Sequence, residues 1–444
     1  MMIITILDMF LVIVLFLNSF FRSAIYWYPN VLASLLNYLL VVVMLIRFYL
    51  TLKEQKTRRS CKAEYIYILF TIMYIVTILL NDNIISNMKY FVLTFIQLFI
   101  VRKCYIKSGN LYSVIVKLYI IIVFGVNIIS LIAPLMGEEL LLVGNIYCGL
   151  FTGPNIAAIV EGLLIVLVFQ EFIKSQSYQK QILYTAIILS GVIMFKQMQS
   201  RAGILFVGSF FFLVIIFHFK SLFNKISNCI LLALMVSVYV LATYNISEYI
   251  NIKMTQENVI AQEVDNVEKQ KLIEVELENM MDIETEESEN MEKEQPTTVK
   301  REKSNVEESN HYRINLLKYG MKAVFVKPLL GIGVENIATK LELLAGEYLS
   351  GSEGGGVHNS YLTVFIANGI LGGIMFVFIM CGTLKRIISF QKNQINLNMD
   401  RIDLTSYIVL SLMGYGLVES SLIFSSSIVA FMFWLFIGRV EMNE

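Results

Sequence analysis

Charged residues are scarce in this chain, and their scarcity excludes an ordinary soluble protein. Only 16% of the 444 residues are Asp, Glu, Lys or Arg, whereas 57% are hydrophobic. Soluble globular domains carry about 25% charged and about 45–50% apolar residues. The composition therefore predicts an all-α polytopic membrane protein, because a helix satisfies its own backbone polar groups in lipid. The net formal charge is zero, and no nucleic-acid partner is expected.

Cysteine is also infrequent, and its placement excludes a cysteine-based framework. The five cysteines are scattered with no paired spacing, which predicts neither a structural disulfide nor a metal site. No cofactor is expected. The first apolar stretch lacks a basic start and a small-residue cleavage site, so we interpret it as an uncleaved first span.

Long apolar blocks recur along nearly the whole chain, and each is long enough to cross a hydrocarbon core roughly 30 Å thick. We predict twelve transmembrane helices, near residues 2–21, 31–50, 65–80, 84–101, 111–133, 155–173, 182–198, 202–219, 229–246, 359–383, 404–418 and 421–438. Three of these blocks are short, so ten crossings is the alternative. Losing the third and fourth blocks together would leave the topology unchanged.

Basic residues gather in alternate loops, which the positive-inside rule assigns to the cytoplasm. These groups are Lys53, Lys56, Arg58, Arg59 and Lys62; Arg102, Lys103 and Lys107; Lys220 and Lys225; and Lys385, Arg386, Lys392 and Arg401. Both termini are then cytoplasmic. The predicted organisation is an N-terminal transmembrane bundle (1–246), one large extracytoplasmic loop between the ninth and tenth spans (247–358), and C-terminal transmembrane helices (359–444).

The large loop begins with an acidic insert at residues 257–309. Residues 247–310 hold eighteen Asp and Glu against seven Lys and Arg, and the insert has no aromatic residue. Such a composition cannot bury enough apolar surface to offset its ordering entropy, which favours an insert without catalytic duty. The alternative is an acidic collar that repels polyanions or meets a basic partner.

An amphipathic segment at residues 312–326 follows the insert. Its apolar positions mark one helical face, which predicts a helix lying on the outer membrane surface or on the bundle. These positions are Ile314, Leu317, Met321, Val324 and Phe325.

Among the three histidines, only His358 lies within a recognisable pattern. It is followed by Asn359, nine further residues and then Gly369 and Gly372, at the predicted outer start of a membrane helix. A titratable ring at that position favours a function, because imidazole exchanges a proton near neutral pH.

Two arginines are predicted on the outer side, where the positive-inside rule leaves few cations. Arg201 stands at the mouth of the eighth span, and Arg313 begins the amphipathic segment. Two guanidinium groups could grip a pyrophosphate bidentately. The alternative for Arg201 is snorkelling to lipid headgroups.

Few carboxylates lie within or beside apolar runs. Asp8 and Glu161 are the deepest. Each is either a proton-relay or substrate group or a buried packing partner, and we favour the packing partner. Glu419, in the short outer turn before the last span, is a weaker site candidate.

Four short motifs in this order resemble the O-antigen polymerase and O-antigen ligase superfamily over about residues 150–435. They are His358-Asn359-x9-Gly369-x2-Gly372, Arg313-x3-Leu317, Ser200-Arg201-Ala202-Gly203 and Thr152-Gly153-Pro154-Asn155. One departure is that Leu329 stands where the family has a glycine after the loop arginine, and Gly331 comes two residues later. The acidic insert is a second departure.

The resemblance implies a fold similar to the C-type glycosyltransferases and a bacterial cytoplasmic-membrane location. It further implies inverting, metal-independent transfer of an undecaprenyl-pyrophosphate-linked oligosaccharide to a hydroxyl at the outer face. Membrane lipid, a flippase and a chain-length regulator are the further partners implied. By the same resemblance, Arg201 and Arg313 hold the pyrophosphate and His358 orients or deprotonates the acceptor. The substrate-binding candidates are Asn359, Asn155, Tyr361 and Glu419.

The resemblance leaves two enzyme activities open. A polymerase joins one lipid-linked repeat to another, building capsule, exopolysaccharide or O-antigen, whereas a ligase transfers glycan to lipid A-core or a protein. We favour the polymerase, partly because the richness in Ile, Lys and Asn suits an AT-rich Gram-positive genome without lipid A. A flippase or exporter of lipid-linked oligosaccharide is the alternative of another class, but it would show internal repeats, and none is visible.

Overall fold

The computed structural model describes residues 2–24, 64–103, 109–132, 141–143, 146–244, 306–346, 357–394 and 402–442. The predicted span at 31–50, the acidic insert up to residue 305 and the glycine-rich stretch before His358 lie outside these ranges. The chain divides into two compact units, one formed by Met1–Met235 with Ser304–Glu444 and the other by Val236–Lys303. The second unit is described only as far as Tyr244, so the site and its surroundings belong to the first.

The described part is mostly helical. Its N-terminal helices are α1 (Met2–Ala24), α3 (Glu64–Leu79), α4 (Ile84–Phe95), the π-helical η2 (Ile96–Val101) and α6 (Gly109–Ile132). The middle helices are α7 (Pro154–Lys174), α8 (Tyr178–Gln197), α9 (Arg201–Phe223) and α10 (Ile226–Tyr244). The C-terminal helices are α12 (Val306–Val324), α13 (Ile337–Ala345), α14 (Ser360–Gln394), α15 (Thr405–Tyr415) and α16 (Ile428–Met442). A small antiparallel hairpin, β1 (Leu141–Val143) with β2 (Ile146–Gly149), is an addition to the predicted all-α fold.

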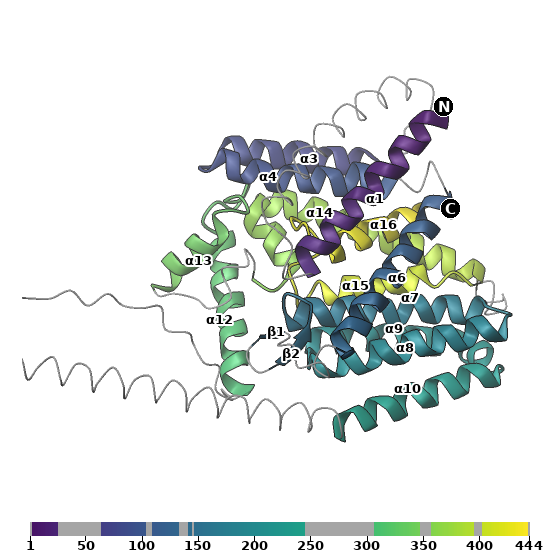
Figure 1. Cartoon of the computed structure of the whole chain (residues 1–444). Helices are drawn as coiled ribbons and strands as arrows, with labels where there is room; N and C mark the ends of the chain where they lie inside the picture. The colour runs from purple at the N-terminus through teal and green to yellow at the C-terminus, as the bar shows by residue number, and fades with distance from the viewer. Residues whose placement is uncertain are drawn as a thin grey trace, which may run out of the picture. The chain divides into compact units, whose positions relative to one another are not determined.

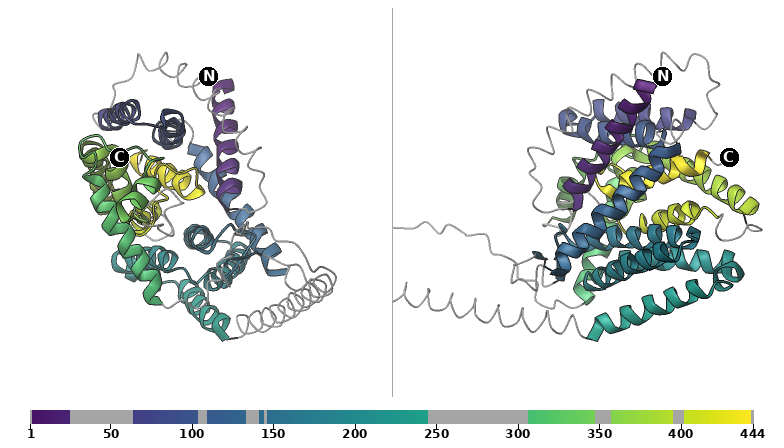
Figure 2. Two further views of the ribbon diagram at one scale, coloured as in Figure 1. Left: turned by 90° about the vertical axis from the view of Figure 1, so that its left-hand side faces the viewer. Right: turned by 45° about the vertical axis from the view of Figure 1, so that its right-hand side comes forward.

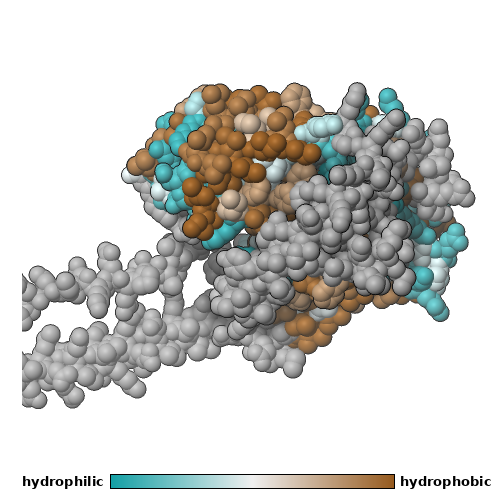
Figure 3. Space-filling view, turned by 90° about the horizontal axis from the view of Figure 1, so that it is seen from above, coloured by the Kyte–Doolittle hydropathy of each residue, from teal (hydrophilic) through white to brown (hydrophobic). Residues whose placement is uncertain are grey.

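Five helices in the described part are long and apolar enough to cross a membrane. They span Ile84–Val101, Leu111–Ile132, Pro154–Lys174, Arg201–Phe223 and Ser360–Lys392. The face over α3 and α4 is an apolar band with hydrophilic residues at its ends (Figure 3). On α3, apolar side chains such as Ile68, Ile72 and Leu79 are exposed. Such a band is what lipid requires of an outer surface, and the predicted total of twelve spans stays a prediction.

Within the first unit, the C-terminal helices lie between two groups of earlier helices (Figure 1). Helix α14 packs against α3, and α15 packs against α9, which in turn contacts α7. Helix α7 is buried almost all round, because it is covered by α6, α8 and α9. This explains why its sequence is apolar on every face and not only along one stripe.

The last predicted span, at 421–438, differs from the structure. Helix α15 ends at Tyr415 and α16 begins only at Ile428, so residues 416–427 are not helical. The Gln97 side-chain amide donates to the Ser425 carbonyl (2.5 Å), and the Trp434 ring N–H donates to the Leu422 carbonyl (3.0 Å). Non-helical backbone at membrane depth is tolerated where protein covers it. These side chains supply the hydrogen bonds that a helix would have made internally.

Candidate functional site

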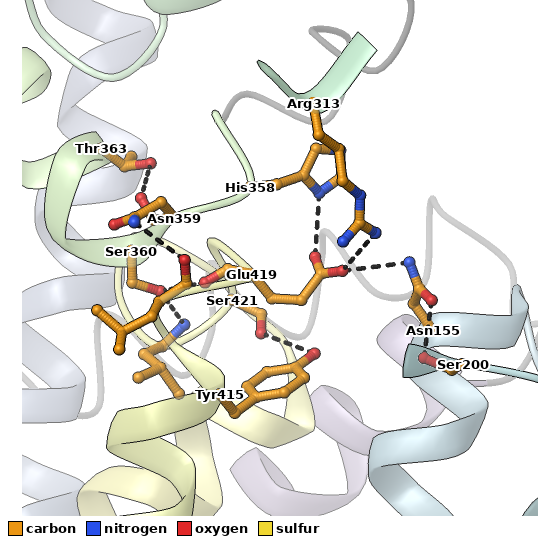
Figure 4. A network of polar contacts seen from close by, with 12 residues as sticks. Asn155, Ser200, Arg313, His358, Asn359, Ser360, Thr363, Tyr415, Glu419 and Ser421 are labelled. Atoms are coloured by element: carbon orange, nitrogen blue, oxygen red, sulfur yellow. Dashed lines mark hydrogen bonds and ion pairs between the residues drawn. The ribbon is translucent and has the colours of Figure 1, made fainter. Parts of the chain in front are cut away.

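The carboxylate of Glu419 is the centre of a polar network (Figure 4). Its Oε2 lies 3.1 Å from His358 Nδ1. Its Oε1 accepts a hydrogen bond from Asn155 Nδ2 (3.2 Å) and lies 3.5 Å from Arg313 Nη2. Asn155 is held in turn by Ser200, whose hydroxyl donates to Asn155 Oδ1 (2.9 Å). The Glu419 residue is only 8% exposed, so three side chains from separate segments converge on one buried carboxylate.

Three helices begin at this network. Asn155 is the second residue of α7, Ser200 caps α9 by accepting from the Gly203 N–H (3.3 Å), and His358 lies two residues before α14. The N-terminal end of a helix carries a partial positive charge, equivalent to about half an elementary charge. The field at the network therefore favours an anion, both the resident carboxylate and a phosphate group.

The chain holds His358 in place by local backbone geometry. Its φ angle is +51°, in the left-handed region that non-glycine residues seldom adopt. The next residue, Asn359, caps α14 by accepting from the Leu362 N–H (2.9 Å), and its side-chain amide donates to the Leu417 carbonyl (3.0 Å). Ser360 donates from its hydroxyl to the backbone carbonyl of Glu419 (2.7 Å). The start of α14 and the segment carrying Glu419 are thus joined through backbone and side chain alike.

This arrangement can prepare His358 for proton transfer. A carboxylate oxygen 3.1 Å from Nδ1 favours the tautomer with hydrogen on Nδ1, which leaves Nε2 able to accept a proton. The same carboxylate orients the ring and stabilises the imidazolium that forms when Nε2 takes a proton, as an aspartate does in a Ser-His-Asp triad. The side chain of His358 is 31% exposed, so the described part of the chain leaves it partly open at the surface.

The remaining predicted site residues lie at the same end of the bundle. Arg201 is the first residue of α9, directly after Ser200, and its side chain is exposed. The hydroxyl of Tyr361 donates to the Met413 carbonyl (3.0 Å), between α14 and α15. The amide groups of Asn359 and Asn155 are engaged with protein partners. The structure thus brings His358, Arg313, Asn155 and Glu419 into contact, whereas Asn359 and Tyr361 bond to the segments beside them.

The first glycine of the histidine motif, Gly369, has a structural explanation. Gly369 interrupts α14, with φ +67° and ψ −173°, and the loop after α12 crosses the interruption. The N–H groups of Ile332 and Gly333 donate to carbonyls of the first half of α14, and the Ile370 N–H donates to the Pro328 carbonyl (2.7 Å). A Cβ at Gly369 would lie 2.4 Å from the Leu329 carbonyl, and one at Gly331 would lie 2.3 Å from the Ala367 carbonyl. Only glycine permits the two backbones to approach this closely.

The crossing joins the two segments that carry Arg313 and His358. Helix α12, which holds Arg313, leads into the loop, and α14 follows His358. The end of α3 and the turn that follows it anchor the same loop: Thr77 in α3 donates to the Leu330 carbonyl (2.6 Å), and Asn81 in the turn donates to the Gly331 carbonyl (3.0 Å). The sequence analysis did not predict these contacts of the loop, nor that Ser200 holds Asn155. The polar turn between the two apolar helices α3 and α4 could have indicated that this turn makes contacts elsewhere in the protein.

The comparisons with known proteins agree with the motifs. Residues 184–377 match the family model described as O-antigen ligase, and the match includes Arg201, Arg313 and His358. The resemblance to the O-antigen polymerase and ligase superfamily is therefore confirmed. Together with the apolar helices, the match indicates a multi-pass membrane protein with ligase- or polymerase-type activity on a lipid-linked oligosaccharide. No curated protein matches the chain.

Proposed function

We propose that this protein polymerises undecaprenyl-pyrophosphate-linked oligosaccharide repeats into a surface polysaccharide at the outer face of the bacterial cytoplasmic membrane. The observation that carries the proposal is the contact of Glu419 with His358, Arg313 and Asn155. It brings together an oriented proton acceptor and a cation at one end of the helical bundle. Both groups assist the transfer of a glycan from a diphosphate to a hydroxyl, because the hydroxyl loses a proton and the diphosphate leaves with negative charge.

The proposed reaction is a single inverting displacement without metal. The acceptor hydroxyl oxygen attacks the anomeric carbon of the lipid-linked donor, and the carbon–oxygen bond to the diphosphate breaks. The bonding electrons leave with undecaprenyl diphosphate. His358 Nε2 takes the hydroxyl proton as the new glycosidic bond forms, and Glu419 stabilises the resulting imidazolium.

Arg313 and Arg201 serve the leaving group. One Nη atom of Arg313 lies 3.5 Å from Glu419, and a guanidinium has five N–H donors. The remaining donors of Arg313 are sufficient for a diphosphate oxygen while Glu419 holds the side chain. Arg201 and the starts of α7 and α9 add positive potential where charge develops on the leaving oxygen, which lowers the transition-state energy.

A ligase is the second candidate, because the matching family model carries that description. Both enzymes would use the same donor and the same site. They differ in the acceptor, which is a second lipid-linked repeat in one case and lipid A-core or a protein in the other.

The acceptor requirement separates these candidates. Purified protein in vesicles, given only an undecaprenyl-pyrophosphate repeat unit, should produce a ladder of longer lipid-linked chains without added metal. The His358→Ala protein, purified in parallel, should leave the substrate unchanged. If the unaltered protein also leaves it unchanged until lipid A-core or an acceptor protein is added, the protein is a ligase. Loss of the ladder in chelator would contradict the metal-independent mechanism.

A further inference from the structure

Helix α12 buries one face and exposes the other. Leu316 and Ala323 are buried, and a Cβ at Gly320 would lie 2.7 Å from a methyl group of Val357. This face is therefore packed against the segment that begins α14. The opposite side of α12 bears large apolar residues that the described part of the chain leaves exposed.

The exposed apolar residues form a continuous stripe. Ile314 is 61% exposed, Met321 57% and Phe325 74%, and Leu317 lies on the same line. At 100° per residue these four positions fall within an arc of about 80° and extend for about 17 Å along the helix. Phe325 continues the helical turn, because its N–H bonds to the Lys322 carbonyl. We call these four residues the α12 stripe.

Two lysines border the α12 stripe on one side. Lys318 and Lys322 are exposed and one helical turn apart, at positions rotated by about 20–60° beyond Phe325. Their amino groups lie near the ring of Tyr319, 5.7 and 4.9 Å from its centre. The exposed half of α12 is thus divided lengthwise into an apolar strip and a cationic strip. This division is typical of a helix that lies in the plane of a membrane interface.

The position of α12 agrees with such a placement. The helix runs across the direction of α7, α8 and α9 (Figure 1) and lies at the edge of the first unit when that unit is viewed from the end (Figure 2). Its Arg313 reaches Glu419 beside Asn155 in the first turn of α7, a helix long enough to span a membrane. In a membrane that α7 crosses along its 21 residues, that level would be the level of the headgroups of one leaflet.

We propose that the α12 stripe docks in the membrane surface, with Ile314, Leu317, Met321 and Phe325 among the acyl chains and with Lys318 and Lys322 on lipid phosphates. The partner is the lipid bilayer, identified by the paired apolar and cationic strips. The inference does not depend on the proposed reaction. It gives α12 a further role, which is to hold Arg313 at the depth where the phosphates of a membrane lipid lie.

Spin labels test the proposal by their depth. Single cysteines replace Met321, Phe325, Lys318 or Lys322 in a full-length variant without native cysteines, reconstituted in vesicles of phosphatidylcholine and phosphatidylglycerol. Phe212, exposed on the apolar helix α9, supplies the lipid reference, and Thr339, exposed on α13, supplies the aqueous reference. Labels at Met321 and Phe325 should be relaxed mainly by oxygen, as at Phe212. Labels at Lys318 and Lys322 should be relaxed mainly by a water-soluble nickel chelate, as at Thr339.

Two other results would overturn the proposal. If the labels at Met321 and Phe325 behave like the label at Thr339, the stripe faces water. If both reagents fail to reach them, protein covers the stripe, either a second copy of the chain or another part of it. Circular dichroism of each labelled variant verifies that the helices are retained, so a misfolded variant is recognised before its labels are interpreted.

Discussion

Replacing Glu419 by glutamine provides the sharpest test of the site, because it removes one acceptor and changes almost no volume. Glu419 presents two acceptor oxygens, one toward His358 and the other toward Asn155 and Arg313. Glutamine has one acceptor oxygen and one NH₂ group. If its oxygen serves Asn155 and Arg313, its NH₂ group faces Nδ1 of His358. The imidazole must then accept at Nδ1 and carry its hydrogen on Nε2, where the proposed mechanism needs a free lone pair.

The size of the expected effect follows from the interactions lost. A hydrogen bond to a charged group contributes about 1.5–3 kcal/mol, which is about 10–100-fold in rate if it acts only in the transition state. Fixing the wrong tautomer adds to this loss, and the corresponding change in a Ser-His-Asp triad lowers kcat by about 10⁴. We therefore expect Glu419→Gln to lower kcat by about 10²–10⁴ and to change KM much less.

The assay is the initial rate of chain extension from the lipid-linked repeat by purified protein in vesicles. Glu342→Gln on α13 is the matched control, because it removes one carboxylate outside the network that Figure 4 draws. It should keep the rate within about threefold. A Glu419→Gln protein with a rate as high as that of the control would refute the role assigned to Glu419 and the orientation assigned to His358.

Four further predictions concern the break in α14, the buried Glu161, the role of Arg313 and the membrane topology. Gly369→Ala should lower the melting temperature and the activity, because its backbone conformation alone costs a side-chain-bearing residue about 1–3 kcal/mol. Gly382→Ala in the same helix should be neutral or stabilising, because a Cβ there meets no atom of the described residues within 4 Å. Glu161→Gln should retain activity and melting temperature. Glu161 accepts a hydrogen bond from Asn127 (2.9 Å), and Glu161 Oε1 and Asn127 Oδ1 have no hydrogen-bond partner among the described residues, so a glutamine can accept from Asn127 Nδ2 and donate to Asn127 Oδ1. Loss of glycan from a stable Glu161→Gln protein would instead indicate a proton relay. Arg313→Lys should restore little of the activity lost in Arg313→Ala, because an ammonium group lacks the planar pair of donors of a guanidinium. A lysine variant as active as the unaltered enzyme would contradict the binding of the diphosphate by Arg313. A cysteine at Thr298 should react with an impermeant thiol reagent in intact cells and one at Thr57 should not, and the reverse labelling would place His358 on the wrong side of the membrane.

The sequence predicted the positions of most described helices because apolar length is a local property. The blocks near 84–101, 111–133, 155–173 and 202–219 each correspond to an apolar helix of spanning length. The same reasoning failed at 421–427, the start of the predicted last span, where four of the seven residues are serine and the backbone is not helical. Carbonyl groups of this segment accept hydrogen bonds from Trp434 in α16 and from Gln97, which lies far away in the sequence. Periodicity and hydropathy do not report such distant partners.

The residues of the candidate site were proposed from the sequence, whereas their arrangement around one carboxylate was not, and their roles stay predictions. Spacing and predicted sidedness identified His358, Arg313 and Arg201, while Glu419 was a weak candidate because a single carboxylate in a short turn has no distinguishing pattern. Its central place follows from the contacts between α7, α14 and the segment after α15, which no local signal encodes. The glycines illustrate the same limit. In the sequence, Gly369 and Gly372 were only part of the histidine motif, within the predicted span at 359–383; in the structure, Gly369 breaks that helix and Gly331 packs against the break.

A buried carboxylate at the starts of three helices has a consequence for the ligand-free enzyme. Without Glu419, the positive N-terminal ends of the helices and the guanidinium of Arg313 would face one another with no anion between them. Their mutual repulsion would favour a movement of the side chains apart. With Glu419 present, the donors are held in place by an anion before any substrate arrives, so little reorganisation is needed when charge develops on the diphosphate. The carboxylate thus sets the geometry of the cations as well as the orientation of the base, which is why its removal should affect kcat more than KM.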